Sequence, residues 1–375
     1  MRICYLLLSP TFGMHQYTAD LANRMVQAGH TVQLVTTEHH PAHRYLPDIE
    51  RRTPVSNRTT GFSAEGIQLS SAEAVTEAVK ALRPDVVHVT GPHLWNVLIL
   101  RALRDDGIPV THTLHDLDPH PGTAFGPLIR VWNQWIVRLA DHVLVHANEY
   151  RDRLLEMGLE RSRVGCTPLL HLFLGHIYLN TVVALADDVA YEPWVLFFGR
   201  IERYKGLDHL ITAWAMMEAV NGREAPAPRL VLAGPGDLSD VWSGPLPPGI
   251  EVRNGLIEDE EALDLFRRCG LLVLPYMGAT QSALIPAAYF FHKPVMAAPS
   301  GALDEYVEDG ETGWVIEPNH PASLARCLAA AMRDRERLVD LGRAGHRWYQ
   351  DRRKAELATL LRIYRRLSRA GGGER

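Results

Sequence analysis

The sequence predicts an α/β protein built from two doubly wound parallel sheets. Short apolar runs alternate with longer amphipathic runs, which is the pattern of parallel strands joined by crossover helices. The alternation begins near Ile3, continues through the first half of the chain, and starts again at Trp194. Two complete alternations predict two sheets with a cleft between them, and a length of 375 residues suits two such domains.

The elements expected in the first half follow from this alternation. Apolar runs of strand length are Ile3–Leu8, Thr31–Thr36, Gly66–Leu69, Asp85–Val89, Pro109–Thr113 and His142–His146. Amphipathic runs of helical length are Gln16–Ala28, Ala72–Leu82, Leu94–Arg104, Leu128–Leu139 and Glu149–Met157. Residues 38–62 have no clear period and contain several prolines, so we expect a long loop there.

The second half repeats the pattern. The expected strands are Trp194–Phe198, Arg229–Ala233, Glu251–Arg253, Leu271–Leu274, Pro294–Ala297 and Trp314–Ile316. The expected helices are Leu207–Ala219, Glu260–Arg268, Leu284–Phe291, Pro321–Met332, Arg335–Ala344 and Gln350–Ser368. We place an N-terminal domain in residues 1–180 and a C-terminal domain in residues 181–350, with the linker in 177–193. Residues 351–375 form a last helix that could pack across the joint, followed by a frayed tail.

Composition narrows the functional classes. The net charge of −5 gives no general attraction to nucleic acid, so we expect no nucleic-acid partner. The four cysteines are scattered without disulfide or metal spacing, which favours a reducing, cytoplasmic setting. The segment MRICYLLLSP is typical of a first buried strand rather than a signal peptide, and no apolar run has the length needed to span a bilayer.

A cationic loop follows the first strand of the second half. The apolar strand ends at Gly199 and is followed by Arg200 and, within the next turn, Lys205. Only 4 of the 39 basic residues are lysines, so a lysine in this loop indicates that a compact ammonium is needed there. Such a pair at the carboxyl end of a strand is typical of an anion site for a pyrophosphate or a sugar phosphate. The alternative is a surface arginine and a lysine that merely flanks a helix.

Two glycine-rich or hydroxyl-rich loops follow neighbouring strands. One is Gly234-Pro235-Gly236-Asp237, and the other runs from Gly278 to Ser282 and opens the helix that starts near Leu284. Free backbone amides at that helix start would receive a phosphate. The candidate donor-binding residues are therefore Gly199, Gly234, Pro235, Thr280, Gln281, Ser282, Ala283 and Leu284, with Gly13 of the first half.

Polar residues also collect after the strands of the first half. Gly13 lies between the first strand and the first helix, where a backbone must approach a ligand closely. His115 and Asp116 follow a strand end, and His115 is the preferred site residue of this half. The candidates on the same side are Phe12, Met14, His15, Asp116, His120 and His146. The chain has 18 histidines, but none has the spacing of a metal site, so we expect no metal.

The segment Leu128–Leu139 permits two interpretations. It carries Trp132 and Trp135 together with Arg130 and Arg138, and an aromatic helix flanked by arginines could touch a membrane surface. More often such a helix is packed in a core, with cations that reach to solvent, and we favour that interpretation. The preference for arginine over lysine suggests a GC-rich bacterial genome.

The chain resembles a retaining glycosyltransferase of the family 4 group, with the GT-B architecture. The resemblance covers nearly the whole length and rests on the loop at Gly13, the His115-Asp116 pair, GRIERYKG at 199–206, AGPGD at 233–237 and the long block 274–318. It implies an α/β fold with two Rossmann-like domains that face a central cleft.

The resemblance also implies a reaction. A nucleotide-diphospho-sugar would bind mainly to the C-terminal domain, where Arg200 and Lys205 would hold the diphosphate and stabilise the leaving group. The acceptor would be a glycan, a lipid-linked glycan or a natural product, bound mainly to the N-terminal domain near His115. Transfer would retain the anomeric configuration and would need neither a metal nor a further cofactor.

One departure from the family pattern leaves alternatives open. Aligned on Pro294-Val295, the two glutamates that members typically carry fall near 279–281 and at Ala287, where this chain has no acidic residue. A non-catalytic nucleotide-sugar binder or regulatory partner on the same fold therefore stays an alternative, and a nucleotide-sugar epimerase is a more distant one. The sequence leaves open the sugar, the nucleotide, the acceptor and the oligomeric state.

Overall fold

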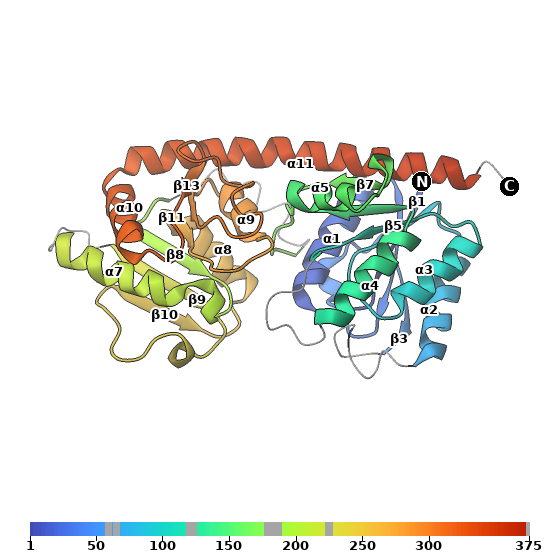
Figure 1. The fold of residues 1–375 in the computed structure, drawn as a ribbon, viewed down its shortest axis with the longest axis horizontal. Coiled ribbons are helices and arrows are strands. Elements are labelled where there is room, and N and C mark those ends of the chain that lie inside the picture. The colour runs from blue at the N-terminus through green and yellow to red at the C-terminus, as the bar shows by residue number, and fades with distance from the viewer. Residues whose placement is uncertain (57–61, 63–67, 118–125, 176–189, 222–227, 373–375) are drawn as a thin grey trace. The chain divides into compact units, whose positions relative to one another are not determined.

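The computed structural model describes residues 1–56, 62, 68–117, 126–175, 190–221 and 228–372. The chain divides into two compact units (Figure 1). Unit 1 consists of Met1–Leu179 with Ala355–Arg375, and unit 2 of Asn180–Lys354. No helix in these described ranges has both the length and the apolarity to span a membrane.

Unit 1 is built on a seven-stranded, all-parallel sheet in the order β3-β2-β1-β4-β5-β6-β7. The strands are β1 (Arg2–Leu7), β2 (Thr31–Thr37), β3 (Glu50–Val55), β4 (Val86–Val89), β5 (Val110–Thr113), β6 (His142–Val145) and β7 (Val164–Cys166). The helices are α1 (Phe12–Gln27), α2 (Leu69–Ala81), α3 (Asn96–Asp105), α4 (Gly126–Leu139) and α5 (Asn148–Glu156). Helices α2, α3 and α4 follow one another along the sheet (Figure 1).

Unit 2 is built on a six-stranded, all-parallel sheet in the order β10-β9-β8-β11-β12-β13. The strands are β8 (Trp194–Phe198), β9 (Arg229–Gly234), β10 (Ile250–Asn254), β11 (Leu271–Leu274), β12 (Val295–Ala297) and β13 (Gly313–Val315). The helices are α7 (Leu207–Asn221), α8 (Asp259–Arg268), α9 (Leu284–Phe290), α10 (Pro321–Arg333) and α11 (Arg335–Gly372).

Both sheets confirm the predicted doubly wound α/β class. In each unit the chain starts in the middle of the sheet, moves to one edge, and returns to build the other side. The order therefore reverses between β1 and β4 in unit 1 and between β8 and β11 in unit 2. In such sheets ligands bind beyond the carboxyl ends of the strands at this point of reversal.

The long helix α11 continues from one unit into the other. Its residues up to Lys354 belong to unit 2 and those from Ala355 to unit 1. In unit 1, the hydroxyl of Tyr364 lies 2.5 Å from Nδ1 of His88 and 3.3 Å from the Tyr5 hydroxyl. Arg24 donates to the buried carboxylate of Glu356 at 2.5 Å. These contacts make the end of α11 part of the core of unit 1.

Several expected elements were wrong. Residues 38–62 contain strand β3 rather than a continuous loop, and Leu69 starts α2 rather than ending a strand. The sequence of β3, ERRTPV, is charged and contains a proline, as edge strands often are, so it lacks the apolar signal of a central strand. Strand β7 has only three residues and was missed.

The two helices expected after residue 334 are one helix, α11, and two glycines explain the difference. A Cβ at Gly342 would lie 1.8 Å from the carbonyl oxygen of His292, and one at Gly345 would lie 2.3 Å from the ring of Tyr289. The glycines permit α11 to approach these residues of unit 2 closely, so they mark tight packing rather than a break in the helix.

Candidate active site

The predicted cationic loop lies at the point of reversal in unit 2. Strand β8 ends at Phe198 and leads into Gly199, whose φ of +126° favours glycine. The neighbouring strand β11 ends at Leu274 and leads into Pro275 and Tyr276. The Met277 amide donates to the Tyr204 carbonyl at 2.8 Å, which ties the two loops together.

Glycines are required where these loops touch. Gly234 has φ +145°, and a Cβ there would lie 2.1 Å from the carbonyl oxygen of Gly199. Gly206 has φ +67°, and a Cβ there would lie 2.0 Å from the Pro275 carbonyl oxygen. The Ile201 amide donates to the carbonyl of Pro235 at 2.8 Å. The structure therefore brings Gly199, Gly234 and Pro235 together, as their places in the sequence predicted.

Arg200 and Lys205 converge on Tyr204. An Arg200 Nη2–H donates to the Tyr204 hydroxyl at 3.5 Å, and Nη1 lies 2.9 Å from the carboxylate of Glu202. The ammonium of Lys205 lies 5.1 Å from the centre of the Tyr204 ring and 3.8 Å from that of Tyr276. Arg200 is exposed, whereas Lys205 is partly buried, and this burial lowers its pKa. The loop holds one solvent-facing and one desolvated cation.

The hydroxyl-rich loop lies against the same region. A Cβ at Gly199 would lie 3.9 Å from Cδ1 of Leu284, the first residue of α9. The loop is fixed because the Ala279 amide donates to Oγ of Ser300 at 2.8 Å and the Ala302 amide donates to the Thr280 carbonyl at 3.0 Å. The Ser282 hydroxyl is buried and accepts a bond of 3.4 Å from the Leu284 amide.

The start of α9 offers fewer amide donors than the sequence suggested. The helix has only seven residues, and its third residue is Pro286, which has no N–H. Ala283 precedes the helix and provides no side-chain cap. Any anion contact of the loop Thr280–Leu284 would therefore depend on side-chain groups and a small number of amides.

The first turn of α1 separates the predicted acceptor-side residues. Phe12 is exposed, and the Arg44 guanidinium lies 4.2 Å from its ring centre. A Cβ at Gly13 would meet nothing within 4 Å. His15 is fully buried, its Nδ1 lies 2.7 Å from the Tyr45 hydroxyl, and burial lowers its pKa to about 4. Of the acceptor-side candidates Phe12, Met14 and His15, only Met14 lines the cavity that contains His115, and the donor-side candidate Gly13 does not line it.

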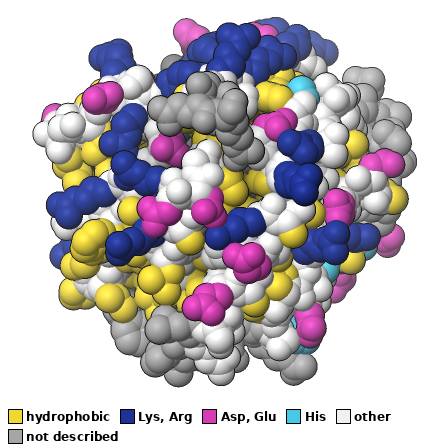
Figure 2. Space-filling view, turned by 90° about the vertical axis from the view of Figure 1, so that its right-hand side faces the viewer, with side chains coloured by type: hydrophobic (Ala, Val, Ile, Leu, Met, Phe, Trp, Pro, Cys, Tyr) yellow, Lys and Arg dark blue, Asp and Glu magenta, His cyan; other side chains and the backbone are white. Residues whose placement is uncertain are grey.

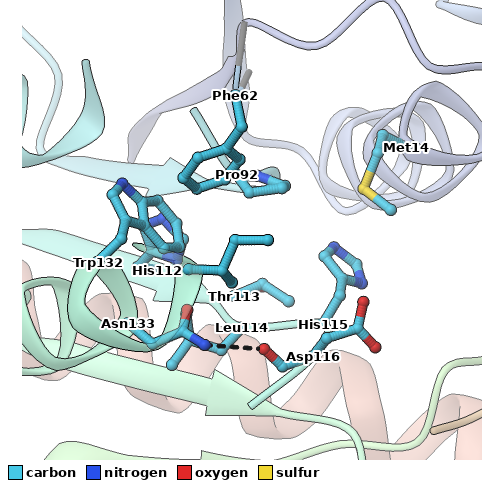
Figure 3. A pocket seen from close by; sticks show the side chains of 11 residues that line it. Met14, Phe62, Pro92, His112, Thr113, Leu114, His115, Asp116, Trp132 and Asn133 are labelled. Carbon is cyan, nitrogen blue, oxygen red and sulfur yellow. Dashed lines mark hydrogen bonds between the residues drawn. The ribbon is translucent and has the colours of Figure 1, made fainter. Parts of the chain in front are cut away.

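A cavity of about 180 Å³ lies beyond the end of β5 in unit 1 (Figure 3). His115 and Asp116 form one side of it. Nε2 of His115 donates to the Thr90 carbonyl at 2.9 Å, and burial lowers the pKa of His115, so the ring is neutral with Nδ1 as an acceptor. The rest of the lining consists of Met14, Phe62, Pro92, His112, Thr113, Leu114, Ile129, Trp132 and Asn133.

The His146 ring packs next to the His115 ring. The two ring centres are 5.1 Å apart, and Tyr17 is in a T-shaped arrangement with each of them. Nδ1 of His146 donates to the Thr167 carbonyl at 2.9 Å, and burial lowers its pKa well below the usual value. His120 lies outside the described residues. Among the described residues, no group of three or more His, Cys, Asp or Glu side chains is arranged to hold a metal ion.

Eight cavity residues were not among the predicted site residues: Phe62, Pro92, His112, Thr113, Leu114, Ile129, Trp132 and Asn133. The sequence did indicate that Trp132 is a packed residue of its helix, and this is confirmed by its exposed fraction of 5%. Trp135 on the same helix is 49% exposed, so the core interpretation was wrong for that residue.

Family comparisons match both units. Residues 12–169 match the glycosyl transferase 4-like domain, and residues 192–334 match the glycosyl transferases group 1. The chain belongs to the group 1 glycosyltransferases, and its fold is GT-B. A D-inositol 3-phosphate glycosyltransferase of Nocardia farcinica is 25% identical over 371 residues, which cover 88% of this chain and 79% of the relative.

Solved structures agree with the GT-B fold of this glycosyltransferase. Sucrose-phosphate synthase from Thermosynechococcus elongatus superimposes with a TM-score of 0.71 at 19% identity and covers 99% of this chain and 100% of its own. HepE from Anabaena, solved in complex with UDP, superimposes with a TM-score of 0.70 at 17% identity and covers 98% of this chain and 99% of its own.

The glycosyltransferase lacks a carboxylate at the second position where the family typically has one. Ala287 is 1% exposed and lies within α9, one turn after Leu284. Its methyl group can make no hydrogen bond to a ribose hydroxyl. Ala287 therefore cannot take the part of a ribose-binding carboxylate.

Proposed function

We propose that this protein transfers a sugar from a nucleotide-diphospho-sugar to an acceptor hydroxyl with retention of the anomeric configuration. The observation that carries the proposal is the convergence of Arg200 and Lys205 on Tyr204 at the point of strand reversal in unit 2. HepE from Anabaena has also been solved in complex with UDP-glucose, which supports a UDP-linked donor. The donor would bind to unit 2 and the acceptor to unit 1.

The two cations suit the charge that develops in this reaction. Breaking the bond between the sugar and the phosphate leaves a diphosphate with additional negative charge. Fixed cations aimed at that oxygen would stabilise it most in the transition state. Burial lowers the pKa of Lys205 in the free protein, and a bound diphosphate would favour its charged form again.

The proton of the acceptor does not need a strong protein base. In a transfer on one face of the sugar, the departing phosphate oxygen can accept that proton. His115, at the cavity of unit 1, would position the acceptor, and the hydroxyl that receives the sugar would keep its proton for the departing phosphate oxygen. No step of this proposal requires a metal ion or an additional cofactor.

Replacement of Lys205 tests the assignment. Lys205→Ala should lower transfer by about 10²–10³-fold, the loss typical when one preorganised stabilising group is removed. Lys354→Ala, an exposed lysine of α11, is the matched control and should leave transfer unchanged. Product would be quantified by mass spectrometry with a panel of nucleotide-sugars, and circular dichroism would verify the fold. Normal turnover by Lys205→Ala would contradict the proposed role of Lys205 in stabilising the leaving group.

The anomeric outcome tests the retaining mechanism separately. Proton NMR of the fresh product should show the same anomeric configuration as the donor. An inverted product would leave the transferase function in place but would require a protein base opposite the leaving group.

We also propose that the outer face of α4 contacts a membrane from the cytoplasmic side. Leu128, Val131 and Trp135 lie at helical spacing and are each about half exposed, and Arg138 lies 5.7 Å from the Trp135 ring. Apolar side chains bordered by arginines fit an anionic lipid surface. Figure 2 looks onto the side of unit 1 that bears α2 and α3, where apolar surface is bordered by basic and acidic side chains.

Vesicle sedimentation tests this contact. The wild-type protein should sediment with phosphatidylglycerol vesicles and not with phosphatidylcholine vesicles, and Trp135→Ala should weaken that binding. Leu256→Ala in unit 2, which removes another exposed apolar side chain, should not. Equal sedimentation of wild type and Trp135→Ala would contradict the contact.

A further inference from the structure

Tyr276 lies at the point of strand reversal in unit 2, beside the cationic loop. It follows the end of β11, and its hydroxyl oxygen lies 4.0 Å from the position that a Cβ would take at Gly199, which follows β8. The side chain is 1% exposed, and its ring centre lies 6.5 Å from that of Phe197 in a T-shaped arrangement. A ring that is buried and packed in this way has little freedom to move.

Backbone contacts fix the loop of Tyr276 against the loop of Lys205. The amide of the residue after Tyr276 donates to the carbonyl of the residue before Lys205 at 2.8 Å. On the other side of each residue, Gly206 approaches Pro275 so closely that a Cβ at Gly206 would lie 2.0 Å from the Pro275 carbonyl oxygen. The fold itself therefore sets the distance between the Tyr276 ring and the Lys205 side chain.

The face of the Tyr276 ring receives the Lys205 ammonium. Nζ lies 3.8 Å from the centre of this ring, and 5.1 Å from the centre of the Tyr204 ring. The face of an aromatic ring is negative, and it attracts a cation within about 6 Å of its centre. Burial lowers the pKa of Lys205, and the charge of Arg200 lowers it further. The attraction of the ring opposes both effects and favours the charged lysine.

An aromatic ring attracts a cation without cancelling its charge. Arg200 in the same loop is paired at 2.9 Å with the Glu202 carboxylate, and that pair has no net charge. Burial raises the pKa of Tyr276 by more than the Ser282 hydroxyl lowers it, so the phenol stays uncharged at neutral pH. A protonated Lys205 on this ring therefore keeps its full positive charge for an incoming anion.

A lysine used in this way gains from a fixed partner. Its four-carbon stem has many rotamers, and ordering the stem when a ligand binds costs free energy. A ring that already holds the ammonium reduces this cost. A charge that is placed before the reaction also needs no reorganisation while the transition state forms.

We infer that Tyr276 is a positioning residue of the transfer reaction, because the face of its ring holds the Lys205 ammonium where the leaving diphosphate gains charge. The inference rests on the proposed function, which assigns Lys205 to the leaving group. Tyr276 acts through Lys205 rather than on the sugar or the diphosphate. The ring has this role and the hydroxyl does not, since the hydroxyl is buried without a partner of normal hydrogen-bond geometry among the described residues.

Fluorination of the ring tests the attraction with little change in packing. Tyr276→Phe would be compared with mono-, di- and trifluorinated phenylalanine at the same position, because fluorine withdraws electron density from the ring face. The pKa of Lys205, measured without donor by competitive acetylation and mass spectrometry, should fall stepwise along this series. The same series at Phe197, a buried ring of the neighbouring strand, is the matched control and should leave that pKa unchanged.

Transfer kinetics of the same variants test the role in the reaction. The kcat should fall in the same order, by about tenfold from phenylalanine to the trifluorinated ring, since a desolvated cation on a ring is stabilised by about this factor or more. The rise in KM should be smaller, because the charge on the diphosphate is greatest in the transition state. Tyr276→Phe should keep at least about half of the wild-type kcat, whereas Tyr276→Leu should lose at least about tenfold.

The two measurements separate the inference from the proposed function. A parallel fall of the Lys205 pKa and of kcat supports the inference. A pKa that does not change with fluorination overturns it, whatever the activity shows. A pKa that falls while kcat stays constant overturns the positioning role and leaves the transferase function standing. If no donor is turned over and UDP does not bind by calorimetry, the proposed function fails and the positioning role with it, while the acetylation result still decides the contact.

Discussion

Lowering the pH from 7.5 to 5.5 is expected to destabilise unit 1 severely. Six of its histidines have an exposed fraction of 8% or less, and burial lowers the pKa of each: His15, His88, His112, His115, His142 and His146. Their hydrogen bonds are to carbonyls, hydroxyls and amides for the most part, so the neutral ring is the native form. No histidine among the described residues of unit 2 is buried to this extent.

The sign and size of the effect follow from proton linkage. The unfolded chain takes up protons on histidine with a pKa near 6.5, whereas the native rings stay neutral, so the unfolded state binds more protons below that pH. Stability is therefore complete above pH 6.5 and is lost as the pH falls below it. At pH 5.5 each of His15, His112 and His142, whose pKa values burial lowers to about 3–4, costs about 1.4 kcal/mol. Together these three cost about 4 kcal/mol, which is a large part of the free energy of unfolding of a typical domain.

Urea denaturation at pH 7.5, 6.5, 6.0 and 5.5 would measure the effect, and hydrogen exchange read by mass spectrometry would assign it to unit 1. His142→Gln is the sharpest variant because His142 lies outside the cavity lining and faces Arg366, whose Nη2 is 2.9 Å from Nδ1. This change should reduce the slope of stability against pH by about 1.4 kcal/mol per pH unit below pH 6. His43→Gln, at an exposed histidine, should leave the slope unchanged.

Two results would refute this reasoning. Equal stability of unit 1 at pH 7.5 and 5.5 would mean that the native histidines accept protons as readily as the unfolded chain does. An unchanged slope in His142→Gln would mean that burial of this ring is not a source of the pH dependence.

Three further changes have expected outcomes. The Glu202 carboxylate lies 2.9 Å from Arg200 and would compete with a bound diphosphate for that cation. Because a surface ion pair contributes only about 0.5 kcal/mol, Glu202→Gln should tighten UDP binding two- to threefold by calorimetry. Weaker binding would contradict this competition. Gly234→Ala should destabilise unit 2 by about 1–3 kcal/mol more than Gly255→Ala in urea denaturation. Both glycines have positive φ, +145° and +137°, but only at Gly234 would a Cβ collide, with Gly199; equal losses would contradict the contact. Tyr364→Phe should cost about 1–3 kcal/mol because it removes the hydroxyl that bonds His88 and Tyr5, and a loss below about 0.5 kcal/mol would contradict that role.

The fold could be predicted where a strand is buried on both faces. β8, β11 and β1 are continuous apolar runs because helices cover both sides of a parallel sheet, and their positions were predicted within a residue or two. β3 could not be predicted in this way because an edge strand needs charge and tolerates Pro54. The unbroken helix α11 was hidden by Gly342 and Gly345, whose role depends on partners distant in sequence.

The candidate site, like the fold, could be predicted only in part from the sequence. Arg200 and Lys205 lie in one loop directly after a strand, so local sequence sufficed to propose them together. The cavity joins Met14, Phe62, His112 and Trp132 from separate elements, and no periodicity brings such residues together. Met14 lines the cavity, whereas the next residue, His15, contacts Tyr45 instead. Adjacent positions on a helix point in different directions, so the sequence alone did not separate the two.

Burial links the acid sensitivity of unit 1 to the chemistry proposed for it. Burial lowers the pKa of His115 in unit 1, so its ring is neutral, while the cations Arg200 and Lys205 lie in unit 2. On the proposed function, unit 2 would carry the charge stabilisation and unit 1 the positioning of the acceptor. The acid limb of the activity profile should then follow the unfolding of unit 1 and shift together with it in His142→Gln. An acid limb that stays fixed while stability shifts would instead assign it to protonation of a group at the active site.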